Sequence, residues 1–411
     1  CFMDSIASLG YSGHGNCIRY NYGFFKQKFE NGYQVEYPQP WLLNSSNVWE
    51  VRKPNDRVTI KFGGRVIMDS NLRATLVDYT AVDAVAYDMP LVGYKNRITN
   101  KLRLWSAEPN MSVPYGPDFD KYENDVRDIS NVLYPDDSTR EGKLLRLKQQ
   151  YFFSAAGLAY IINRENKVYD TLSNLNEHVV IQINDTHPAV LVAELMRTLI
   201  DDNGFYWDQA WKITTQTFAY TNHTILTEAL ETWECDIMKE LLPRIYQIIE
   251  EINKRFIEDL NDKGISKEQI ESVKIIKNNR VHMANLAIVG SFSVNGVAAL
   301  HTEILKNETI KDFHEIFPNK INNKTNGVTH RRWLLNCNPK LSNKITEIIG
   351  DNWIKNIYDL KKIEKKLELT ELVNRIKLNK KKLLSDFIFK KKGIKNFLHF
   401  IYLYVIINLN Q

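Results

Sequence analysis

A short apolar run, followed at once by polar residues and then by a helical pattern, restricts the fold of this 411-residue chain most strongly. Residues 179–183 are rich in β-branched side chains, as are the buried strands of parallel sheets. The polar residues 184–187 follow. Pro188 is then expected to open a helix extending to residue 199, since the first helical position needs no N–H group. This order predicts one strand–loop–helix unit of an α/β sheet.

The same order recurs further along the chain. A short helix is expected over residues 207–211 and a strand over 212–220, and the polar residues 221–224 precede a long helix from about 228 to 260, in which Pro243 marks a candidate break. Residues 281–289 are expected to form a third strand before another helix. Successive units of this kind predict an α/β fold with a doubly wound parallel sheet.

Strand-like runs dominate the first hundred residues, and a strong helical pattern follows them. Turn signals such as Asn31-Gly32 and Gly63-Gly64 separate the runs, so this part is expected to be rich in β-structure. Apolar residues recur at helical spacing over residues 141–163, which predicts a long helix. The expected strands cover residues 24–29, 58–62, 65–68, 74–78 and 84–87.

Polar side chains cluster where the first two expected strands of the α/β part end. Ligands of doubly wound sheets bind beyond the carboxyl ends of the strands, and amide, carboxylate and imidazole groups can hydrogen-bond sugar hydroxyls. The residues alone leave a second reading open, in which Asp185 caps the following helix and His223 is structural. Asn326, next to Gly327, reads first as part of a turn, and Arg331-Arg332 as a structural ion pair. The clustered residues are Asn184, Asp185, His187, Asn222, His223 and Thr224.

The net charge of +5 comes entirely from the C-terminal segment. Residues 355–411 carry 14 basic and five acidic side chains, a net charge of +9, so residues 1–354 have a net charge of −4. The body therefore gives no electrostatic reason to bind a nucleic-acid backbone. The lysine runs 380–382 and 390–392 read as a solvated helix face. The longest apolar run, 397–409, is too short to span a bilayer.

Cysteine usage and the absence of common motifs narrow the chemistry. Four cysteines lie far apart with no Cys-x-x-Cys pair, which fits a reducing cytoplasm better than a disulfide scaffold. The sequence contains no His-Glu-x-x-His motif or other usual ligand spacing, so no metal ligand set is indicated. It also contains no Gly-x-Ser-x-Gly nucleophile motif and no dinucleotide-binding glycine motif after a strand. The chain opens at Cys1 in what reads as a helix, so we expect the N-terminus of the parent protein to be missing.

The chain resembles the α-glucan phosphorylases (the glycogen, starch and maltodextrin phosphorylases), and specifically part of their N-terminal domain. The opening run Cys1–Ser5 is similar to a family helix that follows a glycine-rich turn. Many long motifs in the family's order support the resemblance over residues 1–354. The other matching runs are Gly15–Tyr20, Tyr87–Tyr94, Leu104–Ala107, Val132–Pro135, Leu145–Phe152, Ile183–Pro188, Ala219–Thr224, Glu228–Glu231, Val294–Ala298, Lys324–Thr329 and Arg331–Trp333.

The resemblance implies a GT-B-type glycosyltransferase fold, in which two Rossmann-like lobes face each other across the active-site cleft. This chain would hold one incomplete lobe and lack the second. The implied reaction is phosphorolysis, in which phosphate cleaves the terminal α-1,4-linked glucose of a glucan and releases glucose 1-phosphate. The implied cofactor is pyridoxal 5′-phosphate, carried by a lysine outside this chain. The implied partners are α-1,4-glucan and phosphate, with no nucleic acid or membrane, in a cytoplasmic homodimer.

The resemblance also assigns roles residue by residue. His223 and Asn326 match the family's histidine and asparagine that hydrogen-bond the glucose 6-hydroxyl, and Asp185 and His187 match a pair lining the same pocket. His223 and Asp185 are therefore the catalytic candidates, and no residue of this chain is expected to bind the cofactor or a metal. The substrate-binding candidates are His187, Asn326, Asp137, Asn184, Asn222 and Thr224.

The sequence departs from the family's pattern at several positions. Ser138 replaces a glucose-contacting asparagine in the loop that keeps Asp137, Phe292 stands where histidine is usual, and His330 stands where proline is usual. The resemblance is expected to end near residue 393, and residues 355–411 are expected to form a separate, partly unrelated segment. A frameshift would produce such a segment, and an alternative end with a role of its own is the other reading. The main hypothesis is therefore a phosphorylase fragment that is inactive alone, and the alternative is a noncatalytic glucan-binding module.

Overall fold

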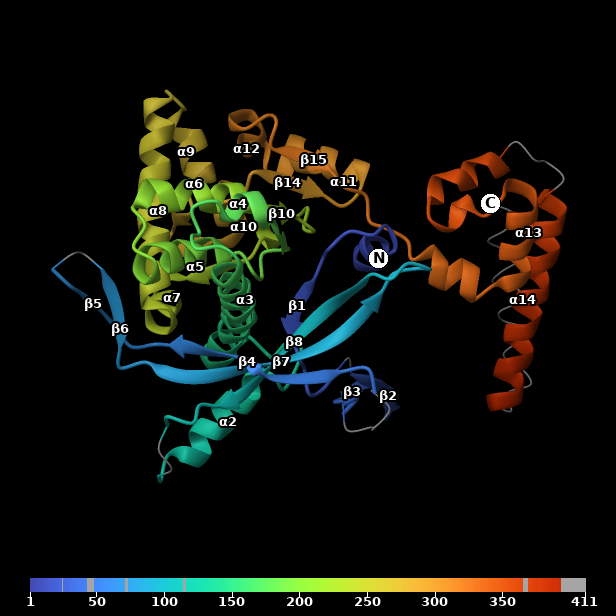
Figure 1. Ribbon diagram of the computed structural model, residues 1–411, viewed down its shortest axis with the longest axis horizontal. Helices are drawn as coiled ribbons and strands as arrows, with labels where there is room; N and C mark the ends of the chain where they lie inside the picture. Colours follow the sequence, from blue (N-terminus) through green and yellow to red (C-terminus); the bar gives the residue numbers. More distant parts are fainter. Residues whose placement is uncertain (24, 43–47, 71–72, 114–115, 365–368, 393–411) are drawn as a thin grey trace. The chain divides into compact units, whose positions relative to one another are not determined.

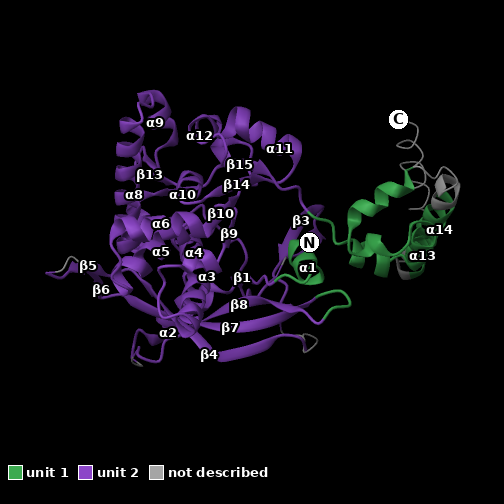
Figure 2. Ribbon diagram, turned by 45° about the horizontal axis from the view of Figure 1, so that its top comes forward, with its two compact units in different colours: residues 1–11, 93–96, 327–411 green, residues 12–92, 97–326 purple. Residues whose placement is uncertain are grey.

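The computed structural model describes residues 1–411 apart from 24, 43–47, 71–72, 114–115, 365–368 and 393–411. The chain divides into two compact units, shown in Figure 2. The small unit comprises residues 1–11, 93–96 and 327–411, and the large unit residues 12–92 and 97–326. A separate segment over residues 355–411 stays a prediction, and its apolar run 397–409 lies outside the described residues.

A four-stranded parallel sheet forms the centre of the large unit, as the strand–loop–helix units predict. Its strand order is β15–β14–β10–β9, and each neighbouring pair is parallel. Tyr220 is paired with Ile183 on one side and Val294 on the other, and all three side chains are fully buried. The strands are β9 (Ile181–Asn184), β10 (Phe218–Thr221), β14 (Ser293–Gly296) and β15 (Ile321–Asn323).

The helices beside β9 and β10 correct two expected boundaries. The helix expected from Pro188 begins three residues later, as α5 (Leu191–Arg197), and continues as a π-helix over Thr198–Asp202. The expected strand over residues 212–220 is wrong for its first six residues, which belong to α6 (Trp207–Thr217). Side chains of α6 are buried at helical spacing, so packing overrides the β-propensity of its threonines.

The expected strand over residues 281–289 and the expected helix over residues 228–260 are also corrected. Met283–Val289 is helix α10, and every side chain in it is buried. An apolar run of that length does not distinguish a buried helix from a buried strand. The other region holds a 3-10 turn (Thr227–Ala229) and β11 (Thr232–Glu234) before two helices begin. These are α7 (Cys235–Leu241) and α8 (Pro243–Asp262), so the candidate break near Pro243 is confirmed, with Pro243 at the first helical position.

A long helix and several short elements complete the α/β part (Figure 1). The helix expected over residues 141–163 is confirmed as α3 (Arg140–Val168), whose first turn is capped by the Thr139 hydroxyl accepting from the Gly142 N–H. Helix α5 packs against α3, α6 and α8. The remaining elements are α4 (Leu175–His178), α9 (Lys267–Val273), β12 (Ile276–Lys277), β13 (Arg280–His282), α11 (Ala299–Ile304), a π-helix (Leu305–Thr309) and α12 (Lys311–Ile316).

The first hundred residues form the expected β-rich part. A second four-stranded sheet has the order β1–β8–β7–β4, in which β1 pairs in parallel with β8 and the other pairs are antiparallel. Two hairpins, β2–β3 and β5–β6, accompany it. The bounds are β1 (Gly15–Ile18), β2 (Lys26–Glu30), β3 (Tyr33–Tyr37), β4 (Val51–Phe62), β5 (Arg65–Met68), β6 (Ala74–Val77), β7 (Thr80–Val92), β8 (Thr99–Pro109) and α2 (Phe119–Ile129).

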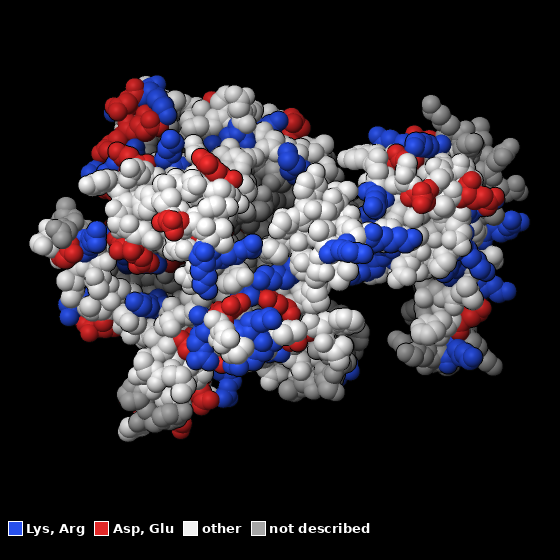
Figure 3. Space-filling model, viewed as in Figure 1, with Lys and Arg blue, Asp and Glu red and all other residues white. Residues whose placement is uncertain are grey.

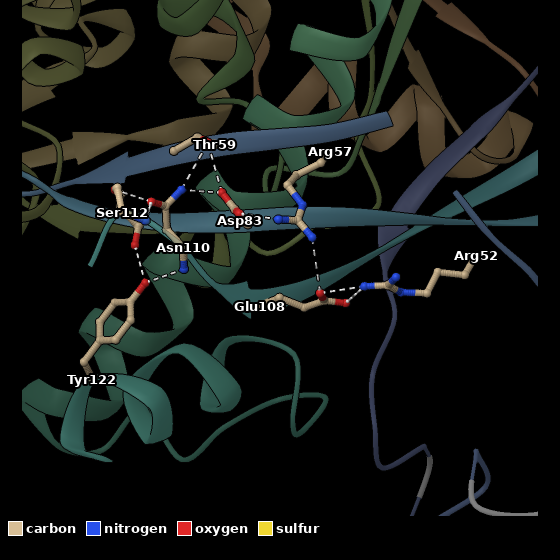
Figure 4. Close-up of polar contacts among 9 residues, drawn as sticks. Arg52, Arg57, Thr59, Asp83, Glu108, Asn110, Ser112 and Tyr122 are labelled. Carbon is tan, nitrogen blue, oxygen red and sulfur yellow. Dashed lines mark hydrogen bonds and ion pairs between the residues drawn. The ribbon is translucent and has the colours of Figure 1, made fainter. Parts of the chain in front are cut away.

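A buried carboxylate joins β4, β7 and the end of β8 (Figure 4). The side chain of Asp83 in β7 accepts hydrogen bonds from the Thr59 hydroxyl at 2.9 Å and the Asn110 amide at 2.6 Å, and pairs with Arg57 at 3.2 Å. The Tyr122 hydroxyl ties α2 to the same region by donating to the Ala81 carbonyl. Asp83 is only 2% exposed, so these partners compensate the cost of burying its charge.

The small unit has a small apolar core of Ile345, Trp353 and Ile354, and an ion pair with a buried arginine links its first helix to the segment after residue 330. Arg331 pairs with Asp4 of α1 at 2.5 Å and donates to the Ile354 carbonyl, which confirms the structural reading of this arginine. Its neighbour His330 is buried and contacts the same carbonyl at 2.8 Å. The elements are α1 (Phe2–Ser8), a π-helix (Arg331–Asn336), α13 (Pro339–Ile349), two 3-10 helices (Asn352–Ile354 and Ile357–Ile363) and α14 (Leu369–Lys392).

Two further observations concern the charged side chains at the surface and the apolar character of the described helices. Basic and acidic side chains are interspersed over the face of the large unit seen in Figure 3. Among the helices that the structure describes, none combines the length and the apolar character needed to cross a bilayer.

Candidate functional site

The carboxyl edge of the parallel sheet brings together residues from two of its polar loops. Asn184 ends β9, and His223 lies two residues beyond β10. The His223 Nε2 atom is 2.7 Å from the Asn184 side-chain oxygen, across the two neighbouring strands. His223 is exposed, so its second ring nitrogen can meet a ligand. The expectation that the two loops meet at one edge is therefore correct.

Asp185 has an unusual backbone conformation that directs its side chain. Its φ of +68° lies in the left-handed region, where aspartate and asparagine are tolerated better than most residues. Its N–H donates to the Thr221 carbonyl at 3.0 Å, and its Oδ1 accepts from the Thr186 N–H at 2.7 Å. The residue at the start of α5 is Val190, which has no side-chain cap, so the helix-cap reading of Asp185 is wrong.

Two histidines and a free carboxylate oxygen make this edge a hydrogen-bonding surface. Within the described part of the chain, Oδ2 of Asp185 accepts no hydrogen bond, and neither ring nitrogen of His187 has a partner. His187 is partly buried beside the start of the turn that leads into α5. These groups can accept from and donate to hydroxyls of a bound polyol.

Asn222 lies behind His223 and holds its loop. Its side chain is fully buried, donates to the Tyr220 hydroxyl at 3.2 Å and accepts from the Thr224 N–H at 2.9 Å. Its backbone N–H donates to the Asn295 carbonyl of β14. These bonds fix the backbone on both sides of His223, so the imidazole is presented from a rigid support.

Asn326 follows β15 and reaches the same edge from the far strand. Its N–H donates at 3.0 Å to the carbonyl of Val297, which follows β14, and its side chain is exposed. The loops after β9, β10 and β15 thus all carry candidate residues. Asn326 is the last residue of the large unit, and its position beyond a strand end explains why it reads as a turn in the sequence.

A polar row across the sheet escapes the sequence analysis. The Gln182 amide donates to the Thr221 hydroxyl at 2.8 Å, and that hydroxyl donates to the Asn295 side-chain oxygen at 2.9 Å. The row crosses β9, β10 and β14 near their carboxyl ends. Gln182 and Asn295 lie within strands and Thr221 opens the second polar loop, and only the sheet register reveals that the three are neighbours.

Asp137 is not brought into contact with the two strand-end loops. Its carboxylate pairs with Arg146 of α3 at 3.2 Å, and Arg146 lies 3.9 Å from Glu231. Glu231 also accepts from the Gln150 amide at 2.7 Å, while its second carboxylate oxygen is buried without a partner among the described residues. The sequence offers no signal for Arg146 or Glu231 beyond their place in motifs quoted for the resemblance.

The cluster of Asp137, Arg146 and Glu231 is linked electrostatically to the sheet edge through Tyr220. Burial raises the pKa of the Tyr220 hydroxyl well above its usual value, and the negative charges of Asp185 and Glu231 raise it further. One buried hydroxyl thus experiences both carboxylates.

The sequence and its relatives agree on one family. A family model described as carbohydrate phosphorylase matches residues 1–406, which passes the expected end of the resemblance near residue 393. The chain is 48% identical over 401 residues to a Bacillus subtilis glycogen phosphorylase, covering 96% of this chain and 50% of that protein. It is 42% identical to a Synechocystis glycogen phosphorylase, covering 89% and 44%, and 40% identical to the Ovis aries liver form, covering 96% and 49%. The chain spans about half the length of the curated relatives it matches.

Proposed function

The chain belongs to the carbohydrate phosphorylase family, and we propose that it supplies the glucose-binding sheet edge of an α-glucan phosphorylase. In that reaction phosphate cleaves the terminal α-1,4-linked glucose and leaves glucose 1-phosphate. Relatives named glycogen phosphorylase support the reaction class. The contact that carries the proposal is the 2.7 Å pair between His223 and Asn184, beside Asp185 at the carboxyl ends of parallel strands. The parallel sheet would then be the core of one Rossmann-like lobe of a GT-B fold.

His223 and Asn326 are proposed to orient the terminal glucose. When Nε2 of His223 donates to the Asn184 oxygen, Nδ1 is left as an acceptor for a sugar hydroxyl. The exposed amide of Asn326 both donates and accepts, so the pair can clamp a primary hydroxyl. Holding the sugar in one orientation increases the rate, because the entropy cost of aligning the reacting groups has already been met on binding.

Asp185 is proposed to stabilise positive charge that develops on the sugar ring. Bond cleavage at the anomeric carbon gives an oxocarbenium-like transition state. The free oxygen of Asp185, held in place by the Thr186 and Thr221 backbone, supplies a preorganised negative charge on this edge. His187 is proposed to bind a further hydroxyl from the same loop, and Asp137 is proposed to act from the Arg146 side.

The cofactor implied by the family does not fit these residues. The described side chains of the sheet edge are amides, carboxylates, hydroxyls and imidazoles, which suit neutral sugar hydroxyls. Lys324 follows β15, but its ammonium group donates to the Asn322 side-chain oxygen at 2.7 Å. These groups do not provide the lysine and the phosphate cradle that pyridoxal 5′-phosphate requires. We therefore assign the cofactor no residue and no step here, and we do not expect this chain alone to catalyse phosphorolysis.

Two measurements on this chain test the proposal. Calorimetric titration with maltopentaose should show saturable binding, and His223→Ala should weaken it about tenfold, as loss of one or two hydrogen bonds implies. His178→Ala is the matched control, because His178 is an exposed histidine of α4 that lies before the amino end of β9. Equal loss in both variants, or no binding at all, would contradict a glucose site at the sheet edge.

An assay for glucose 1-phosphate separates the proposal from its alternative. Glucan, phosphate and pyridoxal 5′-phosphate are supplied together, and release by this chain alone would contradict the assignment of the cofactor elsewhere. A noncatalytic glucan-binding module also predicts binding without release, and the family membership favours the enzyme. If a fragment that contains the remaining half of a relative's sequence restored the release of glucose 1-phosphate, the noncatalytic glucan-binding module would be excluded. A homodimeric parent in the cytoplasm is proposed from the family and from the cysteine usage.

A further inference from the structure

A groove at the opposite, amino edge of the parallel sheet is separate from the proposed glucose site. The Phe292 N–H donates to the carbonyl of Phe218, the first residue of β10, which fixes the position of the groove at this edge. The groove has a volume of about 330 Å³ and is lined by residues of α6, α8 and the end of α10. Its lining includes Trp211, Phe256, Ser291, Phe292, Phe317 and Lys320.

Aromatic rings form the walls of the groove. Phe256 and Phe317 lie with ring centroids 6.4 Å apart and planes 23° apart, and Trp211 lines the groove beside them. Phe292 is 48% exposed, at the position where the resembling family usually has histidine. A second hollow of about 480 Å³ continues past Trp211 and Phe256 toward Trp207. Stacking between such rings favours a flat, apolar group over a flexible chain.

Two hydrogen-bond donors in the groove lack a full set of partners. Ser291 is 1% exposed, and its hydroxyl has no hydrogen-bond partner among the described residues. The Lys320 ammonium group lies 4.4 Å from the Phe317 ring centroid and donates to the Ile288 carbonyl at 3.0 Å. An ammonium group has three donors, so Lys320 retains capacity for an acceptor. A buried polar atom without a partner in a cavity indicates a missing ligand group or water.

The charges around Lys320 favour an anion. Asp259, the acidic residue in the lining, is engaged with Lys263 at 2.6 Å. Burial and the positive charge of Lys263 lower the pKa of Lys320 to about 8. An anion placed against the ammonium group would stabilise its charged form and so oppose both effects.

We propose that this groove binds a small planar aromatic carboxylate. The ring lies among Trp211, Phe256, Phe292 and Phe317, and the carboxylate accepts hydrogen bonds from the Lys320 ammonium group and the Ser291 hydroxyl. A neutral sugar would leave the ammonium charge uncompensated, and a cation would be repelled by Lys320. The site shares no residue with the sheet-edge residues of the proposed glucose site.

Calorimetric titration of the full 411-residue chain with 1-naphthoate tests the proposal. Saturable one-to-one binding is expected, and 1-naphthalenemethanol, which has the same ring and no charge, should bind at least tenfold more weakly. Lys320→Met should weaken naphthoate about tenfold and leave the alcohol unchanged, and Phe292→His should weaken both. Lys306→Met is the matched control, because Lys306 does not line the groove.

The pH dependence of binding gives a second readout that misfolding cannot mimic. The bound anion favours the charged form of Lys320, so the pKa of Lys320 rises on binding, and naphthoate affinity should fall as pH increases above about 8. The Lys320→Met variant should lose this fall. Equal affinity for acid and alcohol, full affinity in Lys320→Met, or a flat profile between pH 7 and about pH 9.5 would each overturn the proposal.

Discussion

Replacing Asp185 with alanine, glycine and asparagine separates its backbone role from its chemical role. Its φ of +68° lies in the left-handed region, and its Oδ1 holds the N–H of the buried Thr186 at 2.7 Å. Asparagine can keep both the conformation and the hydrogen bond. Glycine keeps the conformation but loses the hydrogen bond. Alanine loses the hydrogen bond and is strained in the left-handed region.

The expected changes in the free energy of unfolding follow from these two contributions. Losing the bond to the Thr186 N–H costs about 1 kcal/mol, and holding alanine in the left-handed region costs about 1 kcal/mol more than holding aspartate or asparagine there. Alanine should therefore destabilise the protein by about 2 kcal/mol. Glycine should change stability little, because its freedom from strain offsets the lost bond, and asparagine should be near neutral.

Urea unfolding and maltopentaose titration together check the reasoning. Stability should rank wild type, asparagine and glycine together above alanine. Binding should instead drop about tenfold in all three variants, because each one removes the carboxylate charge. An alanine variant as stable as the asparagine variant would refute the backbone argument, and wild-type binding in the asparagine variant would refute the role of the charge.

Two further predictions concern the stability of the large unit. Asp83→Asn should lower the free energy of unfolding by about 2 kcal/mol in urea titrations, because Arg57 loses its closer ion partner and the amide replaces a buried oxygen that accepts a hydrogen bond. Asp78→Asn, in an exposed pair with Arg65, should cost less than about 0.5 kcal/mol and serves as its control. Burial, with help from nearby lysine and arginine charges, lowers the pKa of His282 to about 4, so the folded state holds this ring neutral. Stability should therefore fall as pH drops from about 6.5 to 4, a window in which the unfolded chain binds the extra proton. His282→Gln should flatten that part of the profile, and an unchanged profile would contradict the assignment.

The parallel sheet and its polar edge are predictable because their signals are local. A β-branched run that ends in Asn184 and Asp185 and is followed by a helical pattern specifies a strand, a loop and a helix. The carboxyl ends of parallel strands share one edge, so the meeting of Asn184 with His223 follows from topology. The left-handed backbone of Asp185 does not follow, because it depends on a hydrogen bond to Thr221 in another strand.

The boundaries of secondary structure were less predictable where apolar runs are completely buried. Residues 283–289 are apolar throughout apart from Asn285, and that residue is satisfied by carbonyls of Val273 and Lys274 in a distant segment. Periodicity has no contrast when every face is buried, so the run reads equally well as a strand. The α6 threonines mislead for a related reason, since their helical state is set by what they pack against.

The sequence by itself determined the family, the α/β class and the pair of strand-end loops, because motifs and β-to-helix transitions are encoded in neighbouring residues. Only the tertiary structure decided which of those polar groups face a ligand. It buries Asn222, exposes His223, frees one oxygen of Asp185 and joins Asp137 to Arg146 and Glu231. It also assembled the aromatic groove around Lys320 from four separate stretches of chain. Burial and unpaired donors depend on contacts between residues far apart in the sequence, and no local pattern records them.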